Sequence, residues 1–234
     1  MSTLADPIAR DKRSDRPALR IVDRDRTHTY RDFCTTAWKA GHALRHLGVH
    51  EGSRVAVTPD PAPQVVWTLF GAASLGALLT FDVTADARVV VVPADREAEA
   101  DDGRSVVAYG GAPTAATTTH WEKVVWSENP AMPPTTPSSS DPVLDADARS
   151  YTHGDLYNGA EAIVDDAFLD AETSVALRAP LADPRAVVAG VIAPLLAGGT
   201  VVVPDGAEEP VADVAVGDGP VPEQRQVGLD AVTR

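Results

Sequence analysis

Apolar residues recur along the chain with two different periods, and together these predict alternating strands and helices. Short runs rich in Val, Ala and Leu, such as residues 54–59 and 87–93, are typical of buried strands. Three- and four-residue steps separate the apolar residues Phe33, Ala37, Ala40, Leu44 and Leu47, which predicts a helix, and the apolar run 63–76 predicts another. We therefore expect an α/β fold with mostly parallel sheets and helices on both faces. The predicted strands are 18–23, 27–30, 54–59, 77–82, 87–93, 105–111, 174–180, 199–205 and 211–219, and the predicted helices are 30–47, 63–76, 119–126, 153–168 and 183–198.

A stretch rich in Pro and Ser interrupts this alternation and predicts a linker. This stretch lies within residues 127–147. That segment separates a first α/β lobe, 17–126, from a second α/β segment, 148–216. Residues 217–234 show no periodicity, so we expect a C-terminal tail without regular structure.

The chain has a strong excess of negative charge. It carries 34 acidic and 20 basic residues, which gives a net charge of −14. Such a surface repels the phosphates of DNA and RNA, so a nucleic-acid partner is not expected. No apolar run reaches membrane-spanning length, and the first residues lack the apolar core of a signal peptide. We expect a cytoplasmic protein with no membrane partner.

The basic residues are almost all arginines, since Lys12, Lys39 and Lys123 are the only lysines. An acidic surface poor in lysine is typical of proteins that work in concentrated salt, where screening reduces the repulsion between like charges. This composition indicates a halophilic, archaeal source. The alternative is an ordinary acidic cytosolic protein.

A few polar residues could carry metal or acid–base chemistry. His42, His46 and His50 are four residues apart, but Gly48 ends the predicted helix between the last two, and no complete ligand set is present. The single cysteine, Cys34, fits an apolar position of its helix. We expect a solvated helix face here and no metal site.

His153 stands with Asp155 and Tyr157 in a pattern that could serve acid–base catalysis. Thr152 before it is a favourable helix cap, and Asp155 suits the first turn of a helix, so a capped helix start explains the same residues. No nucleophile is placed beside His153 in the sequence. We predict no catalytic residue.

Three longer stretches carry motifs of a known family. Residues 27–57 contain THTYRDF and HLGVHEGSRVAV, residues 64–82 read QVVWTLFGAASLGALLTFD, and residues 187–205 read VVAGVIAPLLAGGTVVVPD. In this order and spacing they resemble the adenylate-forming ligases, the family of acyl-CoA synthetases and AMP-binding proteins. The resemblance implies part of the N-terminal domain of an acyl-CoA synthetase. In that family ATP and Mg activate a carboxylic acid as an acyl-adenylate, and the acyl group then passes to a thiol such as CoA.

The phosphate loop of this family is missing from the sequence. In relatives, a loop rich in Ser, Thr and Gly ends in Pro-Lys, so that backbone amides and a lysine can hold phosphates. Residues 141–143 and 151–156 resemble the two flanks of the loop, but residues 144–150, LDADARS, contain no Gly, Thr or Lys. The comparison implies that the loop is deleted. The remaining positions of the nucleotide region are then Ser150, directly before the second flank, and Thr152 and His153 within that flank.

Other departures point the same way. The family's substrate-facing "PLfH" reads Pro-Leu-Ala-Asp here, so Ala182 and Asp183 occupy the positions of the aromatic residue and the histidine. The segment between Asp82 and Ala87 is short where relatives carry a further helix. The parts of the family that follow residue 205, with the adenine-binding segment and the mobile C-terminal lobe, have no counterpart in this sequence.

These departures predict a non-catalytic, acyl-CoA synthetase-like protein that acts as a binding or regulatory partner in acyl activation. Binding of ATP, Mg or CoA is not expected. One alternative is a subunit of a split ATP-dependent acid–CoA ligase, and another is a vestigial remnant. Because such a chain would leave apolar faces uncovered, we also expect a homo-oligomer or a full-length ligase as partner.

Overall fold

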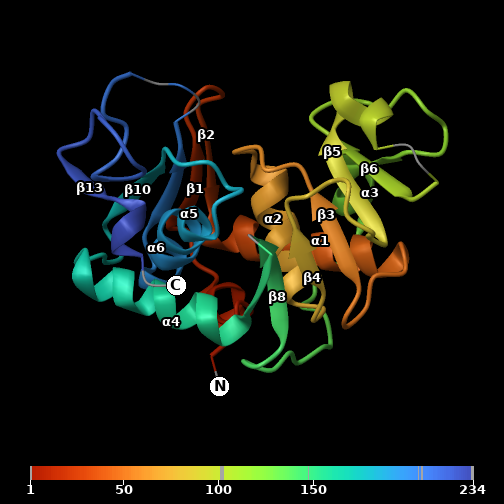
Figure 1. Ribbon diagram of the computed structural model, residues 1–234, viewed down its shortest axis with the longest axis horizontal. Helices are drawn as coiled ribbons and strands as arrows, with labels where there is room; N and C mark the ends of the chain where they lie inside the picture. Colours follow the sequence, from red (N-terminus) through yellow and green to blue (C-terminus); the bar gives the residue numbers. More distant parts are fainter. Residues whose placement is uncertain (1, 101–102, 147, 205, 207, 233–234) are drawn as a thin grey trace.

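A single layer of helices lies between two β-sheets (Figure 1). The computed structural model describes residues 2–100, 103–146, 148–204, 206 and 208–232. Within this described part, sheet A has six strands in the order β13-β12-β10-β11-β1-β2, and sheet B has seven in the order β7-β6-β5-β3-β4-β8-β9. Only the pairs β1–β2 and β8–β9 of the described strands are antiparallel. The expected fold of mostly parallel sheets with helices is confirmed.

The strands of sheet A are β1 (Pro17–Ile21), β2 (Arg26–Thr29), β10 (Ser174–Leu177), β11 (Thr200–Val203), β12 (Val214–Val216) and β13 (Arg225–Val227). Those of sheet B are β3 (Arg54–Val57), β4 (Leu78–Thr80), β5 (Val89–Pro93), β6 (Ser105–Tyr109), β7 (Thr119–His120), β8 (Pro142–Ala146) and β9 (Arg149–Thr152). The α-helices are α1 (Tyr30–His46), α2 (Pro63–Ala73), α3 (Trp121–Ser127), α4 (His153–Asp166), α5 (Pro184–Val187) and α6 (Ala193–Ala197). A π-helical turn, η4 (Val188–Ile192), and four short 3₁₀-helices, η1 (Asp6–Ile8), η2 (Arg10–Lys12), η3 (Ala94–Glu99) and η5 (Leu229–Ala231), complete the described elements. None of these helices has the length and apolar character needed to cross a lipid bilayer.

Alternating side chains show which face of each sheet the helices cover. Val55 of sheet B and Val201 of sheet A belong to the main core, together with apolar residues of all the α-helices. Their neighbours along the strands, Ala56 and Val202, point to the opposite faces. Ala56 belongs to a second, smaller core under η3. The α-helices therefore cover the inner faces, and the predicted helical cover of the outer faces is replaced by η3 and by irregular segments.

The two sheets do not follow the predicted division of the chain at residues 127–147. Strands β1 and β2, from the start of the chain, pair with the late strand β11, where Leu19 lies opposite Val201. Strands β8 and β9 join sheet B, where Leu144 lies opposite Leu79. Parallel pairing brings together segments that are far apart in sequence, and a local hydrophobic pattern does not report such partners.

The connection from β4 to β5 is unusually short. It crosses over β3 in residues 81–88, without a helix. Parallel strands normally need a crossover of a dozen or more residues, usually a helix that covers the sheet. The short segment predicted between Asp82 and Ala87 is therefore found, and it leaves part of the outer face of sheet B uncovered.

The predicted helix 183–198 is divided in the structure. Asp183 caps α5 by accepting a hydrogen bond from the backbone of Arg185 at 2.9 Å, with Pro184 at the first helical position. Pro194 has no N–H to donate to the preceding turn. The π-helical turn η4 lies directly before α6. The helix therefore accommodates Pro194 by changing from π-helical to α-helical pitch.

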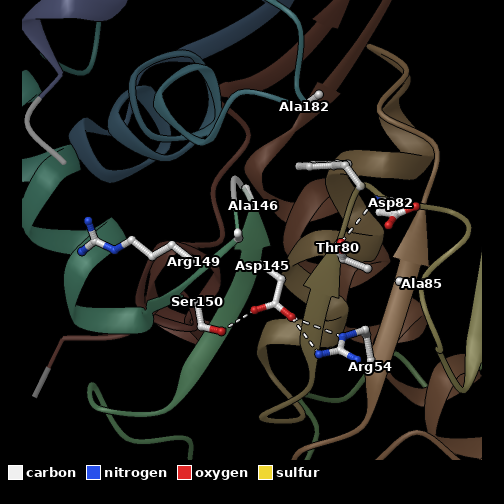
Figure 2. A pocket seen from close by; sticks show the side chains of 11 residues that line it. Arg54, Thr80, Asp82, Ala85, Asp145, Ala146, Arg149, Ser150 and Ala182 are labelled. Atoms are coloured by element: carbon white, nitrogen blue, oxygen red, sulfur yellow. Dashed lines mark hydrogen bonds and ion pairs between the residues drawn. The ribbon is translucent and has the colours of Figure 1, made fainter.

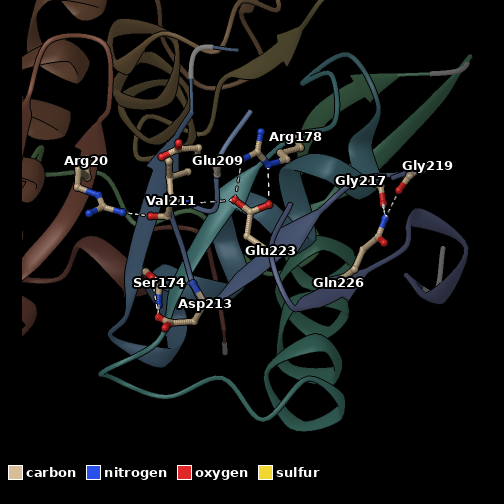
Figure 3. A network of polar contacts seen from close by, with 10 residues as sticks. All are labelled: Arg20, Ser174, Arg178, Glu209, Val211, Asp213, Gly217, Gly219, Glu223 and Gln226. Atoms are coloured by element: carbon tan, nitrogen blue, oxygen red, sulfur yellow. Dashed lines mark hydrogen bonds and ion pairs between the residues drawn. The ribbon is translucent and has the colours of Figure 1, made fainter. Parts of the chain in front are cut away.

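The last part of the chain is held against sheet A by polar contacts (Figure 3). The buried carboxylate of Glu223 accepts two hydrogen bonds from Arg178, each of 2.7 Å, and one from the backbone of Val211 at 3.2 Å. Strand β13 extends the sheet beside β12. The prediction of a tail without regular structure is therefore wrong for Arg225–Val227 and Leu229–Ala231.

Candidate functional site

A closed β-hairpin stands where the sequence predicts the remnant of a phosphate loop. In the ladder between β8 and β9, Leu144 pairs with Tyr151, Asp145 with Ser150, and Ala146 with Arg149. Only residues 147 and 148 separate the last pair, and residue 147 lies outside the described part. Residues 144–146 and 149–151 are thus committed to strand pairing and do not form an open loop.

A cavity of about 600 Å³ lies beside this hairpin, on the outer face of sheet B (Figure 2). Residues of the short connection between β4 and β5 form one side of the cavity. The cavity therefore lies in the region that this short connection leaves open. The lining residues are Arg54, Thr80, Phe81, Asp82, Ala85, Asp145, Ala146, Ala148, Arg149, Ser150 and Ala182.

An ion pair occupies the centre of the cavity wall. One oxygen of Asp145 accepts hydrogen bonds from Nε and Nη2 of Arg54, at 3.2 and 2.9 Å. The other accepts a hydrogen bond from the Ser150 hydroxyl. Both carboxylate oxygens therefore have donors, and the charge of Arg54 is balanced within the protein.

The remaining charged groups at the cavity give it no strong anion site. The guanidinium of Arg149 lies over the ring of Tyr151, 4.6 Å from its centroid. The side-chain hydroxyl of Thr84, followed by its backbone N–H, donates to Asp82 and holds the pKa of that carboxyl below its usual value. The two arginines and two carboxylates that line the cavity thus leave it without the net positive charge that a triphosphate would need.

The structure brings together two of the five residues predicted from the sequence. Ser150 and Ala182 both line the cavity (Figure 2). Thr152 instead caps α4 in a reciprocal capping box with Asp155, through backbone-to-side-chain hydrogen bonds of 3.0 and 2.9 Å. Asp183 caps α5 and pairs with Arg185. These two have local partners that explain them without a ligand.

His153 is fully buried and does not line the cavity. Its Nδ1 accepts a hydrogen bond from the backbone N–H of Leu4 at 3.2 Å, which places the proton of the neutral ring on Nε2. Nε2 is buried and has no hydrogen-bond partner in the described part of the chain. Burial lowers the pKa of His153 to about 4, although nearby Asp141 and Asp6 act in the opposite direction.

We expect His153 to make the folded protein sensitive to acid. The unfolded chain takes up a proton near pH 6.5, whereas the folded chain resists it until about pH 4. Stability contributed by the neutral ring is therefore present above pH 6.5 and is lost as the pH falls, by about 2 kcal/mol between pH 7 and pH 5. Replacing His153→Asn keeps an acceptor for Leu4 and removes the titration.

Urea denaturation at about pH 7, 6 and 5 measures this difference. The fall in the free energy of unfolding should be smaller in His153→Asn than in the native protein. The matched control is His46→Asn, which changes an exposed histidine, and in it the fall should remain larger than in His153→Asn. An equal fall in all three proteins would contradict the assignment.

Sequence reasoning missed the pair of Arg54 and Asp145. The signal was present in the strand alternation: Arg54 lies opposite Leu78, and Thr80 lies opposite Asp145, so all four side chains share the outer face of sheet B. What the sequence did not show was that these strands are neighbours.

The histidines considered as metal ligands have separate partners. His42 contacts the carbonyl of Ala131 at 2.9 Å, His46 contacts Glu128 at 2.7 Å, and His50 contacts its neighbouring backbone. In the described part of the chain, no three His, Cys, Asp or Glu residues are grouped so that they could hold a metal ion.

Comparison with known proteins agrees with this geometry. Residues 8–81 match the family model of the AMP-binding enzymes. The anthranilate CoA ligase AuaEII, solved with anthranoyl-AMP, superposes with a TM-score of 0.78 at 18% identity, over 92% of this chain and 49% of the ligase. The benzoate CoA ligase of Burkholderia xenovorans LB400 gives 0.77 at 18% identity, over 93% and 50% of the two chains. The N-terminal domain of FACL13 from Mycobacterium tuberculosis gives 0.76 at 16%, over 92% and 62%. No curated protein sequence matches the chain.

The fold is that of the N-terminal domain of acyl-CoA synthetases. With the match over residues 8–81, it confirms the resemblance to the adenylate-forming ligases that the sequence motifs indicate. The chain spans about half the length of the two solved ligases. At these identities, the superpositions establish the fold and leave the activity to be argued from the site.

The family implies ATP and Mg, and the residues at the hairpin do not fit them. The segment 144–150 has neither a glycine nor a lysine, and its hairpin is closed by strand pairing. The carboxylate of Asp145 occupies the cavity wall, and Arg54 is paired with it. No step of chemistry through a bound nucleotide is derived from this site.

Proposed function

We propose that this chain is an acyl-CoA synthetase-like protein that does not adenylate, and that it acts as a binding or regulatory partner in acyl activation. The β8–β9 hairpin carries the proposal, because it directly joins the segments 141–143 and 151–156, which resemble the two flanks of the phosphate loop. A phosphate loop works through free backbone amides and a lysine. Here the corresponding residues pair with each other, and Asp145 would repel an anion.

A binding role is supported by the cavity beside the hairpin. Its volume of about 600 Å³ is within the range of small-molecule sites, and Ala182, at its rim, leaves room that the family's aromatic residue would fill. A ligand of the family, such as CoA or an acyl-CoA, could contact this surface without the chemistry of adenylation. Because the charges of Arg54 and Asp145 balance each other, we expect the uncharged part of such a ligand to contact this surface.

Thermal unfolding with CoA, an acyl-CoA, AMP and ATP tests the binding role. The acidic composition supports a halophilic protein, so molar KCl is the proper medium. We expect saturable stabilisation by CoA or acyl-CoA, since a ligand at a hundredfold excess over its Kd adds about 2.7 kcal/mol. Ala182→Trp, a change at an exposed position of the cavity, should abolish the shift. No saturable shift with any of the four ligands would support the vestigial remnant instead.

A subunit of a split ligase is the second candidate. It is favoured by the outer faces of the two sheets, which have no α-helical cover in the described part. The partner would be a full-length ligase or a chain that carries a phosphate loop of this family. Trp126 and Phe168 are the two large apolar residues that the described part exposes, so the apolar contact area would be small.

Light scattering in molar salt and co-purification test the partner. A homodimer, or capture of a ligase polypeptide, would support a working partner. A monomer that captures no ligase would count against both association proposals, while the thermal shifts would still report on ligand binding.

A further inference from the structure

A second hollow lies at the carboxyl ends of β3, β5 and β6, away from the hairpin. Two adjoining cavities of about 580 and 890 Å³ form it, and they share lining residues from both sheets. We call it the tryptophan cleft, after Trp67, Trp121 and Trp126, which line the larger cavity. The shared lining residues are Ile21, Arg24, Pro63, Gln64, Gly110 and Gly111.

The topology of sheet B explains why the chain opens here. The connection after β3 runs through α2 on the inner face, whereas the connection after β5 runs through η3 on the outer face. Because β3 and β5 are neighbours, their loops diverge and leave a crevice at the carboxyl ends of the strands. In open parallel sheets, ligands bind at such topological switch points.

One wall of the tryptophan cleft is aromatic. Trp67 stacks on Trp121 with ring centroids 5.8 Å apart and planes at 20°, and His28 meets Trp67 edge-on at 5.0 Å. Trp126 keeps 66% of its surface exposed at the cleft. Among the described residues, an aromatic side chain of this size is exposed at only one other place, Phe168. Since Trp67 and Trp121 are only 6% and 3% exposed, Trp126 is the tryptophan that offers a flat apolar surface to a planar ring at the cleft.

Polar groups at the floor are placed for recognition of a ring edge. Glu122 accepts hydrogen bonds from the backbone of Gly110 and from Gln64, both at 2.8 Å, and lies 3.1 Å from Nε2 of His120. Burial, followed by the charge of Arg26, lowers the pKa of His28, so its ring is neutral at pH 7. The ring nitrogens of His28 have no hydrogen-bond partner in the described part of the chain, and can donate one bond and accept another.

The charge of the cleft restricts its ligand. Its lining has two arginines, Arg24 and Arg26, against six carboxylates: Asp23, Asp25, Asp32, Asp60, Asp95 and Glu122. A phosphate or carboxylate on the ligand would be repelled, whereas a cationic ring would gain both from this field and from the tryptophan faces.

We propose that the tryptophan cleft binds a planar heteroaromatic ring that is neutral or positively charged, and that it discriminates against anionic forms of the same ring. This site is separate from the cavity at the hairpin and does not depend on the proposed function.

Tryptophan fluorescence reports directly on this site, because three of the four tryptophans line the cleft. The probes are guanosine as a neutral ring, 1-methyladenosine as a cation and guanosine 5′-monophosphate as an anion. We expect a saturable change with guanosine and with 1-methyladenosine, and binding of the monophosphate at least about fivefold weaker than guanosine at the lowest salt at which the chain remains folded. No saturable change with either nucleoside up to about 5 mM, or equal binding of the monophosphate, would overturn the proposal.

Two variants locate the binding. Trp126→Ala should weaken guanosine binding about tenfold, since stacking of a base on an aromatic side chain contributes on this scale. Phe168→Ala, a change at an exposed aromatic residue outside the cleft, should leave binding unchanged. Calorimetry follows binding in Trp126→Ala, where one fluorescent group is lost. Unchanged affinity in Trp126→Ala, or an equal loss in Phe168→Ala, would place the ligand elsewhere.

Discussion

Replacing Glu223→Ala should lower the free energy of unfolding by about 3–5 kcal/mol. The side chain of Glu223 is fully buried, and its partner Arg178 is 13% exposed. Without the carboxylate, the guanidinium of Arg178 and the backbone N–H of Val211 lose their partner at Glu223 in a site that water barely reaches. The last part of the chain should therefore detach from sheet A at much lower denaturant.

Urea denaturation, followed by circular dichroism, measures this effect. The matched control is Glu172→Ala, which removes an ion pair to Arg16 in which the glutamate side chain is 92% exposed. That change should cost less than about 1 kcal/mol. Equal effects of the two substitutions would show that the contacts of Glu223 do not hold the C-terminal segment.

Acid should act on the same contact. Burial alone would raise the pKa of Glu223, but the hydrogen bonds from Arg178 and Val211 outweigh it and hold the pKa below the usual value. The stability that this carboxylate contributes is therefore present above the unfolded pKa and is lost as the pH falls below it. The buried pair and His153 both weaken the protein in acid.

Replacing Trp38→Ala should cost about 3–5 kcal/mol, the usual range for a large buried aromatic residue. Trp38 lies on α1 with 1% of its surface exposed, and Arg13 covers its ring at 5.5 Å. Its indole N–H donates to the carbonyl of Ile8 at 3.0 Å. The substitution removes both the packing of α1 and an anchor of the N-terminal segment.

Trp126→Ala is the matched control, because the same change at a residue 66% exposed removes little buried surface. It should cost less than about 1 kcal/mol. Limited proteolysis of Trp38→Ala should in addition show early cleavage before residue 17. A small loss of stability in Trp38→Ala would mean that α1 repacks without the indole, and that the N-terminal segment is held by other contacts.

The helices were the most predictable part of the fold, because their signals are local. Thr152 caps α4 as expected, and Thr29 caps α1 in the same way by accepting from the backbone of Asp32 at 3.1 Å. Gly48 ends α1 with a positive φ of 85°. These features need only the residues of one turn.

Strand partners were less predictable, because they depend on distant residues. The hairpin of β8 and β9 has the acidic sequence of a loop, and its register depends on packing against β4. The strand β13 has only three residues and begins with two consecutive polar ones, Arg225 and Gln226, so its sequence pattern is weak until β12 is beside it. In both places, tertiary pairing outweighs local propensity.

The candidate site was predictable where sequence neighbours determine it. Ser150 lies in β9, Ala182 follows β10, and both line the same cavity; the missing glycine and lysine were visible in the sequence. His153 was the opposite case. Its burial against Leu4 depends on the N-terminal segment folding across the start of α4, which no pattern near residue 153 indicates.

ATP–pyrophosphate exchange by the purified chain in molar KCl, with a panel of aliphatic and aromatic carboxylic acids, tests the central claim most directly. A full-length acyl-CoA synthetase serves as the positive control. Because the β8–β9 hairpin directly joins the two segments that resemble the flanks of the phosphate loop, we expect no acid-dependent exchange above background. Robust exchange that depends on both ATP and the acid would contradict the account.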